Sequence, residues 1–229
     1  MELNEQKQTA VINSRTHLTE AEIEEILELA RQTSKRDWAI LTLAFNHGLR
    51  VSECAGGVPA TDSKAATPPL RLCDIDMKNR QITIRRLKGS LVTTQPVVEL
   101  RGKPAMSGYV ALKEYLAVRI DDGSGLLFTG QKGPLQRWTL TRMFHDYCEK
   151  VSTARVARGL KPIPANAMHF HTLKHSIATI LANRVDNIFA VKNHLGHASI
   201  SSTMSYCHHD PRATNQKVHE ALTGAFIGL

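Results

Sequence analysis

Apolar residues spaced three or four apart predict that most of the chain is helical. Behind Thr19 they recur at this spacing, and Glu22 completes a capping box with Thr19. The same spacing predicts a second helix from about residue 36 to 47, which Gly48 ends as a left-handed cap, and a short helix over 50–53. Further helices are predicted near 105–120, 139–154, 171–184, 186–193, 199–206 and 211–222.

Residues 72–100 follow a different pattern, because apolar and polar side chains alternate there. Such alternation is typical of strands with one buried face. Turn residues at 78–79 and 88–90 separate three alternating segments, which predicts a three-stranded antiparallel sheet. The predicted strands are 72–76, 81–85 and 92–100. The expected fold class is therefore α+β, mainly α, with one small sheet.

Two segments show neither pattern. Residues 1–17 are polar and predict a flexible N-terminal arm, and residues 56–69 consist mostly of Gly, Pro, Thr and Ala, which predicts a loop or insertion. The rest of the chain, 18–229, is expected to form one domain that ends in a tail over 211–229.

Basic side chains are concentrated in the body of the protein. The whole chain has 29 Lys and Arg against 21 Asp and Glu, a net charge of +8. The first 30 residues contain seven acidic and two basic side chains, so the remaining 199 residues contain 27 basic and 14 acidic ones. This excess favours a polyanionic partner, although charge alone leaves an ordinary basic protein equally open.

Membrane and disulfide proteins do not fit the sequence. The longest apolar runs, such as 38–45, are shorter than the roughly 20 residues that span a bilayer. No basic and apolar leader opens the chain, so we expect a cytoplasmic protein with no membrane partner. Without a Cys-x-x-Cys pair, the cysteines are expected to be reduced thiols, mostly in the core. They are Cys54, Cys73, Cys148 and Cys207.

Seven of the eleven histidines lie between residues 169 and 209, so a metal site must be considered. His171 and His175 are four apart on a predicted helix, but a zincin needs Glu after the first His, and Thr172 stands there. Residues 125–130 have the glycine spacing of a phosphate loop without the Lys and Ser or Thr that must follow. A zinc hydrolase therefore remains only as a minor alternative.

The remaining polar residues suit a phosphodiester, which needs cations for its oxygens, imidazoles for proton transfer and a hydroxyl nucleophile. In chain order these residues are Arg50, Glu53, Lys88, His171, Lys174, His175, His194, His197 and Tyr206. This order resembles the tyrosine recombinase (phage integrase) family over residues 18–220. Residues 86–96 also resemble the fimbrial phase-variation invertases, a compact branch of that family.

The resemblance implies a catalytic domain that cuts and rejoins DNA without metal, ATP or another cofactor. Tyr206 would attack the scissile phosphate and form a 3′-phosphotyrosyl link, while Lys88 would protonate the departing 5′-hydroxyl. Arg50 would bind a non-bridging oxygen, with His171 and His197 as hydrogen-bond and proton-transfer partners.

Other residues would support this reaction. Glu53 would orient the catalytic arginine, and His175 would support the site from its helix without touching phosphate. The predicted sheet region, 72–100, is rich in basic residues and would bind DNA through Arg80, Arg85 and Arg86.

The resemblance also implies partners. The substrate would be double-stranded DNA, bound by a homotetramer on paired sites, with accessory DNA-bending proteins as further candidates, so the protein would be nucleoid-associated. Because Arg50 leaves no room for the family's separate N-terminal domain, the catalytic domain would hold DNA alone. Two alternatives stay open: an accessory protein of the same fold with weakened chemistry, and a type IB topoisomerase. The sequence does not distinguish integration, excision, inversion and resolution.

One position departs from the family pattern. The fourth residue of the His-x-x-Arg box is Lys174, which keeps the positive charge but lacks the two-pronged fork of a guanidinium. This predicts a working but slower catalytic site. Lys174→Arg is therefore expected to raise the rate of DNA cleavage, measured against the wild-type protein on one substrate. An unchanged or lower rate would count against this interpretation.

Overall fold

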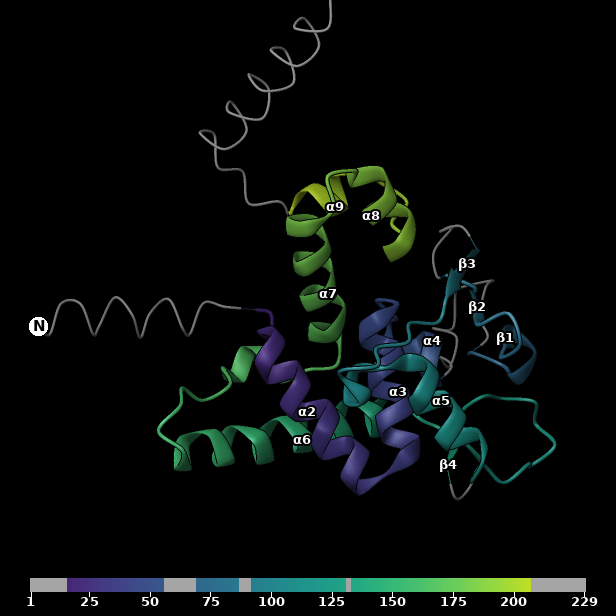
Figure 1. Ribbon diagram of the computed structural model, residues 1–229, viewed down its shortest axis with the longest axis horizontal. Helices are drawn as coiled ribbons and strands as arrows, with labels where there is room; N and C mark the ends of the chain where they lie inside the picture. The colour runs from purple at the N-terminus through teal and green to yellow at the C-terminus, as the bar shows by residue number, and fades with distance from the viewer. Residues whose placement is uncertain (1–15, 56–68, 87–91, 131–132, 207–229) are drawn as a thin grey trace, which may run out of the picture.

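The computed structural model describes residues 16–55, 69–86, 92–130 and 133–206, and these form a mainly helical protein with a small sheet (Figure 1). The helices are α2 (Glu20–Thr33), α3 (Lys35–Asn46), α4 (Val51–Ala55), α5 (Gly108–Leu116), α6 (Arg137–Ala157), α7 (His171–Arg184), α8 (Ile188–Leu195) and α9 (Ser201–Met204). Short 3-10 helices occupy Leu72–Asp74, Pro104–Met106 and Ala165–Ala167. The strands are β1 (Ile75–Asp76), β2 (Gln81–Ile84), β3 (Thr93–Pro96), β4 (Thr129–Gly130) and β5 (Gly133–Pro134).

Helix α2 begins at the predicted capping box. The Thr19 hydroxyl accepts the Glu22 N–H at 3.3 Å, and the Glu22 carboxylate accepts the Thr19 N–H at 2.8 Å. These two bonds satisfy amides that the first helical turn leaves without partners. The apolar residues behind the cap, Ile23 and Ile26 among them, have no exposed surface and pack against α3.

Helix α3 forms the centre of the core. All residues from 38 to 46 are buried, and α2, α5 and α7 pack around them. The indole N–H of Trp38 donates to the Ala105 carbonyl at 2.6 Å, which ties α3 to the segment before α5. Gly48 follows the helix at φ +57°, as predicted for its cap. A Cβ at this position would also lie 2.9 Å from a Leu195 methyl group, so two separate constraints require glycine.

The predicted antiparallel sheet is confirmed, with β2 between β1 and β3 (Figure 1). Ile82 of β2 pairs with Ile75 on one side and Gln95 on the other. The strands are shorter than predicted, because residues 72–74 form a 3-10 turn. A second hairpin, β4–β5, was not predicted. Its strands are only two residues long, which is too short for an alternating pattern.

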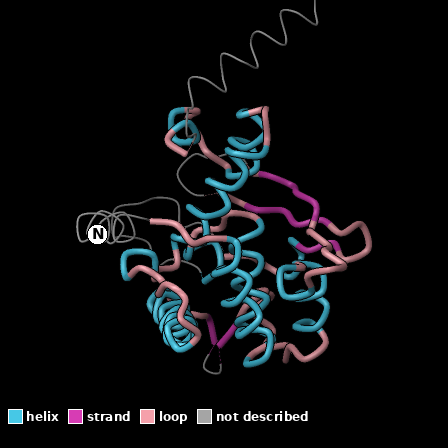
Figure 2. Tube along the Cα trace, turned by 60° about the vertical axis from the view of Figure 1, so that its left-hand side comes forward, coloured by secondary structure: helices cyan, strands magenta, loops and turns pink. Residues whose placement is uncertain are grey.

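Helix α7 extends away from this body and carries α8 and α9 at its far end (Figures 1 and 2). Asn187 caps α8, and Gly196 ends it at φ +63°. Helix α8 returns toward the body and contacts β3, while α9 contacts α7 and α8. The C-terminal end of α8 therefore lies beside the C-terminal end of α3.

Several sequence predictions fall outside the described residues: the arm over 1–15, most of the 56–69 insertion, Lys88 and the tail after 206. Within the described part, Cys54 and Cys148 are buried free thiols as expected, whereas Cys73 is exposed. In the same part of the chain, no helix is long and apolar enough to cross a membrane.

The His47 imidazole, at the end of α3, is fully buried. Its Nδ1 donates to the Gln95 side-chain oxygen at 2.8 Å. Burial lowers the pKa of His47 to about 3, and the nearby His194 and Arg86 add to this shift while the hydrogen bond opposes it.

This imidazole predicts that stability falls in mild acid. The unfolded chain binds protons at His47 below about pH 6.5 and the folded chain does not, so protonation favours unfolding. Between about pH 7.5 and about pH 5, His47 should lower the free energy of unfolding by about 2 kcal/mol, measured by urea unfolding. His47→Asn, which cannot titrate, should reduce the pH dependence by a similar amount. An unchanged dependence would contradict the assignment.

Candidate active site

Arg50 lies at the start of α4, where Glu53 holds it. The Glu53 carboxylate accepts the Arg50 backbone N–H at 2.8 Å and its guanidinium Nη1 at 3.3 Å. The carboxylate lies in the first turn of α4, where negative charge is favourable. Glu53 is buried, while 28% of the Arg50 side chain is exposed. The predicted orienting contact is therefore present, and part of the Arg50 side chain stays exposed.

Arg86 is placed differently from the expectation that it binds DNA. Its side chain has no exposed surface, and burial lowers the pKa of its guanidinium, with the Glu53 charge opposing. It donates to the carbonyls of His47, Gly48 and His194 at 2.7–3.1 Å, and to Glu53 at 3.3 Å. Because the guanidinium is enclosed by these acceptors, it has no surface for DNA. The sequence prediction for Arg86 is corrected to a structural contact.

Lys174 also points inward, from α7. Its Nζ donates to the carbonyls of Gly48 at 3.1 Å and Leu195 at 2.7 Å, and only 2% of the residue is exposed. Burial lowers the pKa of the amine to about 7, and the charges of Arg86 and Arg50 contribute. The phosphate contact predicted for Lys174 stays a prediction, because this amine faces backbone carbonyls here.

Arg86 and Lys174 together join two helix ends. The C-terminal carbonyls of α3 and α8 carry partial negative charge, and the two buried cations lie between them. Gln95 of β3 adds a further link, since its amide N–H donates to the His194 carbonyl at 2.8 Å. We call these four buried residues, Glu53, Arg86, Gln95 and Lys174, the polar bridge.

Sequence reasoning missed Gln95 and the packing of Gly196. Gln95 occupies a buried position on a strand, and a polar residue there was a signal for an internal partner. A Cβ at Gly196 would lie 2.6–2.8 Å from three atoms of the Arg86 side chain. Gly196, in the segment His194-Leu-Gly-His197, is thus required by the polar bridge as well as by its positive φ.

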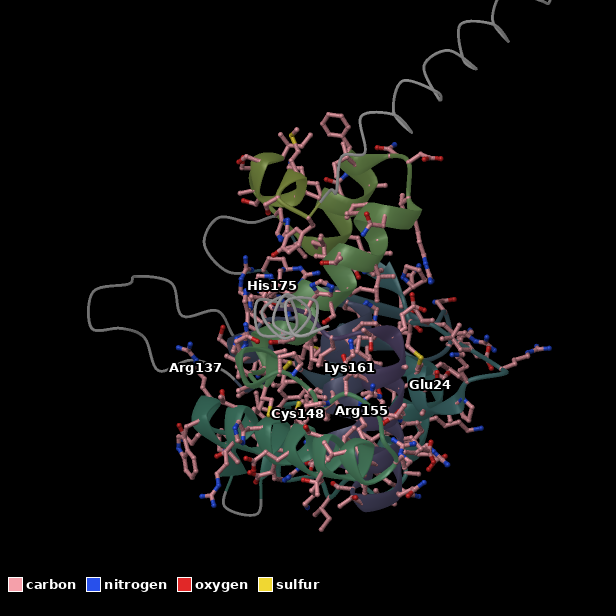
Figure 3. The ribbon with its side chains drawn as sticks, turned by 90° about the vertical axis from the view of Figure 1, so that its left-hand side faces the viewer. Glu24, Arg137, Cys148, Arg155, Lys161 and His175 are labelled. Carbon is pink, nitrogen blue, oxygen red and sulfur yellow. The ribbon has the colours of Figure 1, made fainter. Side chains whose placement is uncertain are left out.

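Tyr206 lies among three histidines. Its hydroxyl is 2.9 Å from His175 Nδ1, and its ring stacks on His197 with the centroids 6.2 Å apart. The His171 ring meets His175 edge-on at 4.6 Å, because residues four apart share one face of α7. His197 Nδ1 is 2.9 Å from the hydroxyl of Thr203, which links α9 to the loop after α8. Figure 3 labels His175 on α7, above the α6 helix.

Burial and the surrounding cations tune these groups. Burial raises the pKa of Tyr206, and the positive charge of Arg50 counters part of that rise. Burial lowers the pKa of His171 and of His197 to about 4, with the charges of Lys174 and Arg50 among the further causes. The imidazoles are therefore neutral at pH 7 and able to donate or accept hydrogen bonds.

The structure thus brings Arg50, His171, His197 and Tyr206 into one site. They come from the residue before α4, the start of α7, the loop after α8, and the residues after α9. His175 lies in the same site, in contact with the tyrosine. Two further residues were predicted to be catalytic: Lys174, whose amine faces the carbonyls of Gly48 and Leu195, and Lys88, which lies outside the described residues.

The two other arginines predicted to bind DNA are on the surface of the sheet region. The Arg80 side chain is 50% exposed, pairs with Glu99 and lies 4.6 Å over the Tyr109 ring. The Arg85 side chain is 42% exposed and pairs with Asp74. Both cations are accessible to a polyanion, although their contact with DNA stays a prediction.

The described residues do not form the zinc site considered for His171 and His175. In residues 16–206, apart from the undescribed gaps, the one group of three possible metal ligands within 4.8 Å of one another is on the exposed face of α6. It consists of His145, Asp146 and Glu149.

Comparison with known proteins identifies consistent relatives. The model of the phage integrase family matches residues 16–212. The type 1 fimbriae regulatory protein FimB of Escherichia coli K12 is 30% identical over 206 residues, covering 87% of this chain and 88% of that protein. Tyrosine recombinase XerA of Pyrococcus furiosus is 29% identical over 211 residues, covering 91% of this chain and 61% of that protein.

Solved structures share the fold. A crystal structure of XerA recombinase has a TM-score of 0.63 at 23% identity and covers 90% of this chain and 65% of that one. The Tn1549 transposon integrase in complex with a circular intermediate DNA has a TM-score of 0.67 at 23% identity, covering 88% and 65%. The chain therefore spans just under two thirds of these structures and most of the length of FimB.

The polar bridge predicts that two arginines differ in how much they contribute to the free energy of unfolding. Arg86→Met should lower the free energy of unfolding by about 3 kcal/mol, because it removes donors from buried carbonyls and a cation from Glu53. Arg80→Met is the matched control, since losing an exposed ion pair should cost at most about 1 kcal/mol. Urea unfolding of both variants measures the difference. Equal losses would show that Arg86 has no special structural role.

Proposed function

Because this chain belongs to the phage integrase family, we propose that it is a site-specific DNA recombinase that cuts and rejoins strands through Tyr206. The observation that carries the proposal is the position of one phenolic hydroxyl. It is hydrogen-bonded to an imidazole and lies within the electrostatic influence of an accessible arginine. A phosphodiester needs such a combination of nucleophile, proton carrier and cation.

Arg50 is the candidate ligand for a non-bridging phosphate oxygen. Its exposed guanidinium can offer two parallel donors, and Glu53 fixes its position before DNA arrives. His171 and His197 are neutral, so they can donate N–H groups to the phosphate without adding fixed charge. Negative charge that develops on the phosphorus oxygens would thus meet oriented donors.

The reaction would proceed by two matched transesterifications. Tyr206 attacks phosphorus and forms a 3′-phosphotyrosyl bond, and the 5′-oxygen leaves with a proton from Lys88. A 5′-hydroxyl of the partner strand then attacks the same phosphorus and releases the tyrosine. One phosphodiester replaces another, so we propose that the reaction uses neither ATP nor a metal ion.

The number of tyrosines sets the assembly. Each chain supplies one Tyr206, and the exchange of two duplexes requires four strand cuts. We therefore infer a homotetramer on two paired sites, in which accessory DNA-bending proteins are further candidate partners. This substrate would place the protein on the nucleoid, in the cytoplasm.

DNA would bind through the basic body of the chain. The exposed Arg80 and Arg85 lie at the two ends of β2, where they can neutralise phosphates. Contacts of this kind release counterions, so the affinity should fall steeply with salt. The arrangement of sites in a genome would then decide between inversion, integration, excision and resolution.

The test is covalent capture on DNA. Wild-type protein is incubated with nicked duplexes that have a randomised segment beside the nick. Because of the nick, cleavage releases a short fragment with a 5′-hydroxyl, which diffuses away and cannot be rejoined. We expect an SDS-stable adduct whose DNA becomes enriched in one sequence. Tyr206→Phe should abolish the adduct, because the attacking oxygen is gone. Tyr147→Phe, which changes a buried tyrosine of α6, is the matched control and should retain it.

Two outcomes separate the alternatives. DNA binding without an adduct would overturn the recombinase assignment and favour an accessory DNA-binding protein. Relaxation of supercoiled plasmid by a monomer, without a second site, would favour a type IB topoisomerase.

A further inference from the structure

The three histidines around Tyr206 have different contacts. His197 Nδ1 is hydrogen-bonded to the Thr203 hydroxyl, and the His171 ring packs edge-on against the ring of His175. It is His175 whose Nδ1 lies 2.9 Å from the Tyr206 hydroxyl, with the two ring centroids 5.5 Å apart. This distance is within the range from which a general base removes a proton.

We propose that His175 is a further catalytic residue, which accepts the phenolic proton as Tyr206 attacks phosphate and returns it when the strand is rejoined. The inference rests on the proposed function and changes the supporting role that the sequence suggested for His175. His171 and His197 are then left to bind the phosphate oxygens.

The proton balance is complete with groups of this chain and DNA. During cleavage the Tyr206 O–H bond breaks, its proton moves to His175 Nδ1, and the phenolic oxygen forms the new bond to phosphorus. The bond from phosphorus to the 5′-oxygen breaks, and that oxygen takes its proton from the general acid. During rejoining the imidazolium of His175 gives its proton back to the departing Tyr206 oxygen.

The surroundings of His175 favour this role. Burial lowers the pKa of its imidazole, and electrostatic interactions with His169, Lys174 and His17 add to the shift, so the ring is an unprotonated base at pH 7. The tautomer with hydrogen on Nε2 leaves a lone pair on Nδ1 for the phenol. Because the Tyr206 pKa is raised, complete transfer before attack is unfavourable. The proton therefore moves together with formation of the oxygen–phosphorus bond.

The test uses a nicked duplex of the sequence captured by the wild-type protein, under single-turnover conditions. Three variants are compared in the full chain: His175→Ala, His175→Asn and, as a matched control, His145→Ala on the exposed face of α6. Asn places an amide oxygen near the position of Nδ1, so it keeps a hydrogen-bond acceptor that cannot take a proton. Thermal unfolding and DNA affinity are measured for each variant.

We expect His175→Ala to slow adduct formation by about 100-fold or more with little change in DNA affinity. Added imidazole should restore its rate in a concentration-dependent manner, because free imidazole can occupy the vacated space. His175→Asn should stay slow, and His145→Ala should match the wild type. DNA in which sulfur replaces the departing 5′-oxygen should not rescue His175→Ala. The sulfur leaves without a proton from a general acid, but the attack by Tyr206 still needs a base.

Three results would overturn the inference while leaving the recombinase assignment intact. These are a His175→Ala rate equal to that of the wild type, full activity of His175→Asn, and a folded His175→Ala protein that imidazole does not rescue. Full activity of His175→Asn would reduce His175 to a positioning residue. If the wild-type protein forms no Tyr206-dependent adduct, the proposed function itself fails.

Discussion

The polar bridge is the interaction on which the rest of the site depends. Two helix C-termini point toward each other, and their carbonyls would repel without the cations of Arg86 and Lys174 between them. Arg50 lies two residues after Gly48, the glycine that follows α3. His197 lies two residues after Leu195, the last residue of α8. The relative position of Arg50 and His197 is therefore set by buried side chains that bond to both helix ends. Glu53 joins the two levels, because it contacts both the buried Arg86 and the accessible Arg50.

Desolvation also shapes the charges of the site. The Arg50 side chain is partly exposed, and desolvation lowers the pKa of His171 and of His197 to about 4, so these imidazoles are neutral at pH 7. A phosphate thus approaches one accessible cation surrounded by neutral donors. This arrangement attracts the anion without trapping it, which suits a reaction that must run in both directions.

Local sequence patterns predicted the parts of this structure that depend on near neighbours. The capping box at Thr19, the left-handed Gly48 and the antiparallel pairing of residues 75–96 follow from spacings of a few residues. The placement of Arg50 near enough to Tyr206 to affect its pKa followed from the family resemblance, since nothing local connects residues so far apart in the sequence. Neither the local patterns nor the family resemblance predicted whether a long side chain points into the core or toward solvent. Arg85 and Arg86 are adjacent and chemically identical, yet one is exposed and the other enclosed.

Helix α9 has only four residues, fewer than an isolated helix needs to persist in water. Its place is therefore fixed from outside, by the bond from His197 to Thr203 and the bond from His175 to Tyr206. Each such bond contributes about 1 kcal/mol net, so undocking this carrier costs far less than unfolding the core. The Tyr206 hydroxyl is thus held in the site by interactions worth only a few kcal/mol. A neighbouring molecule that binds the docked and undocked conformations of α9 with different affinities can therefore control when Tyr206 is in position to react.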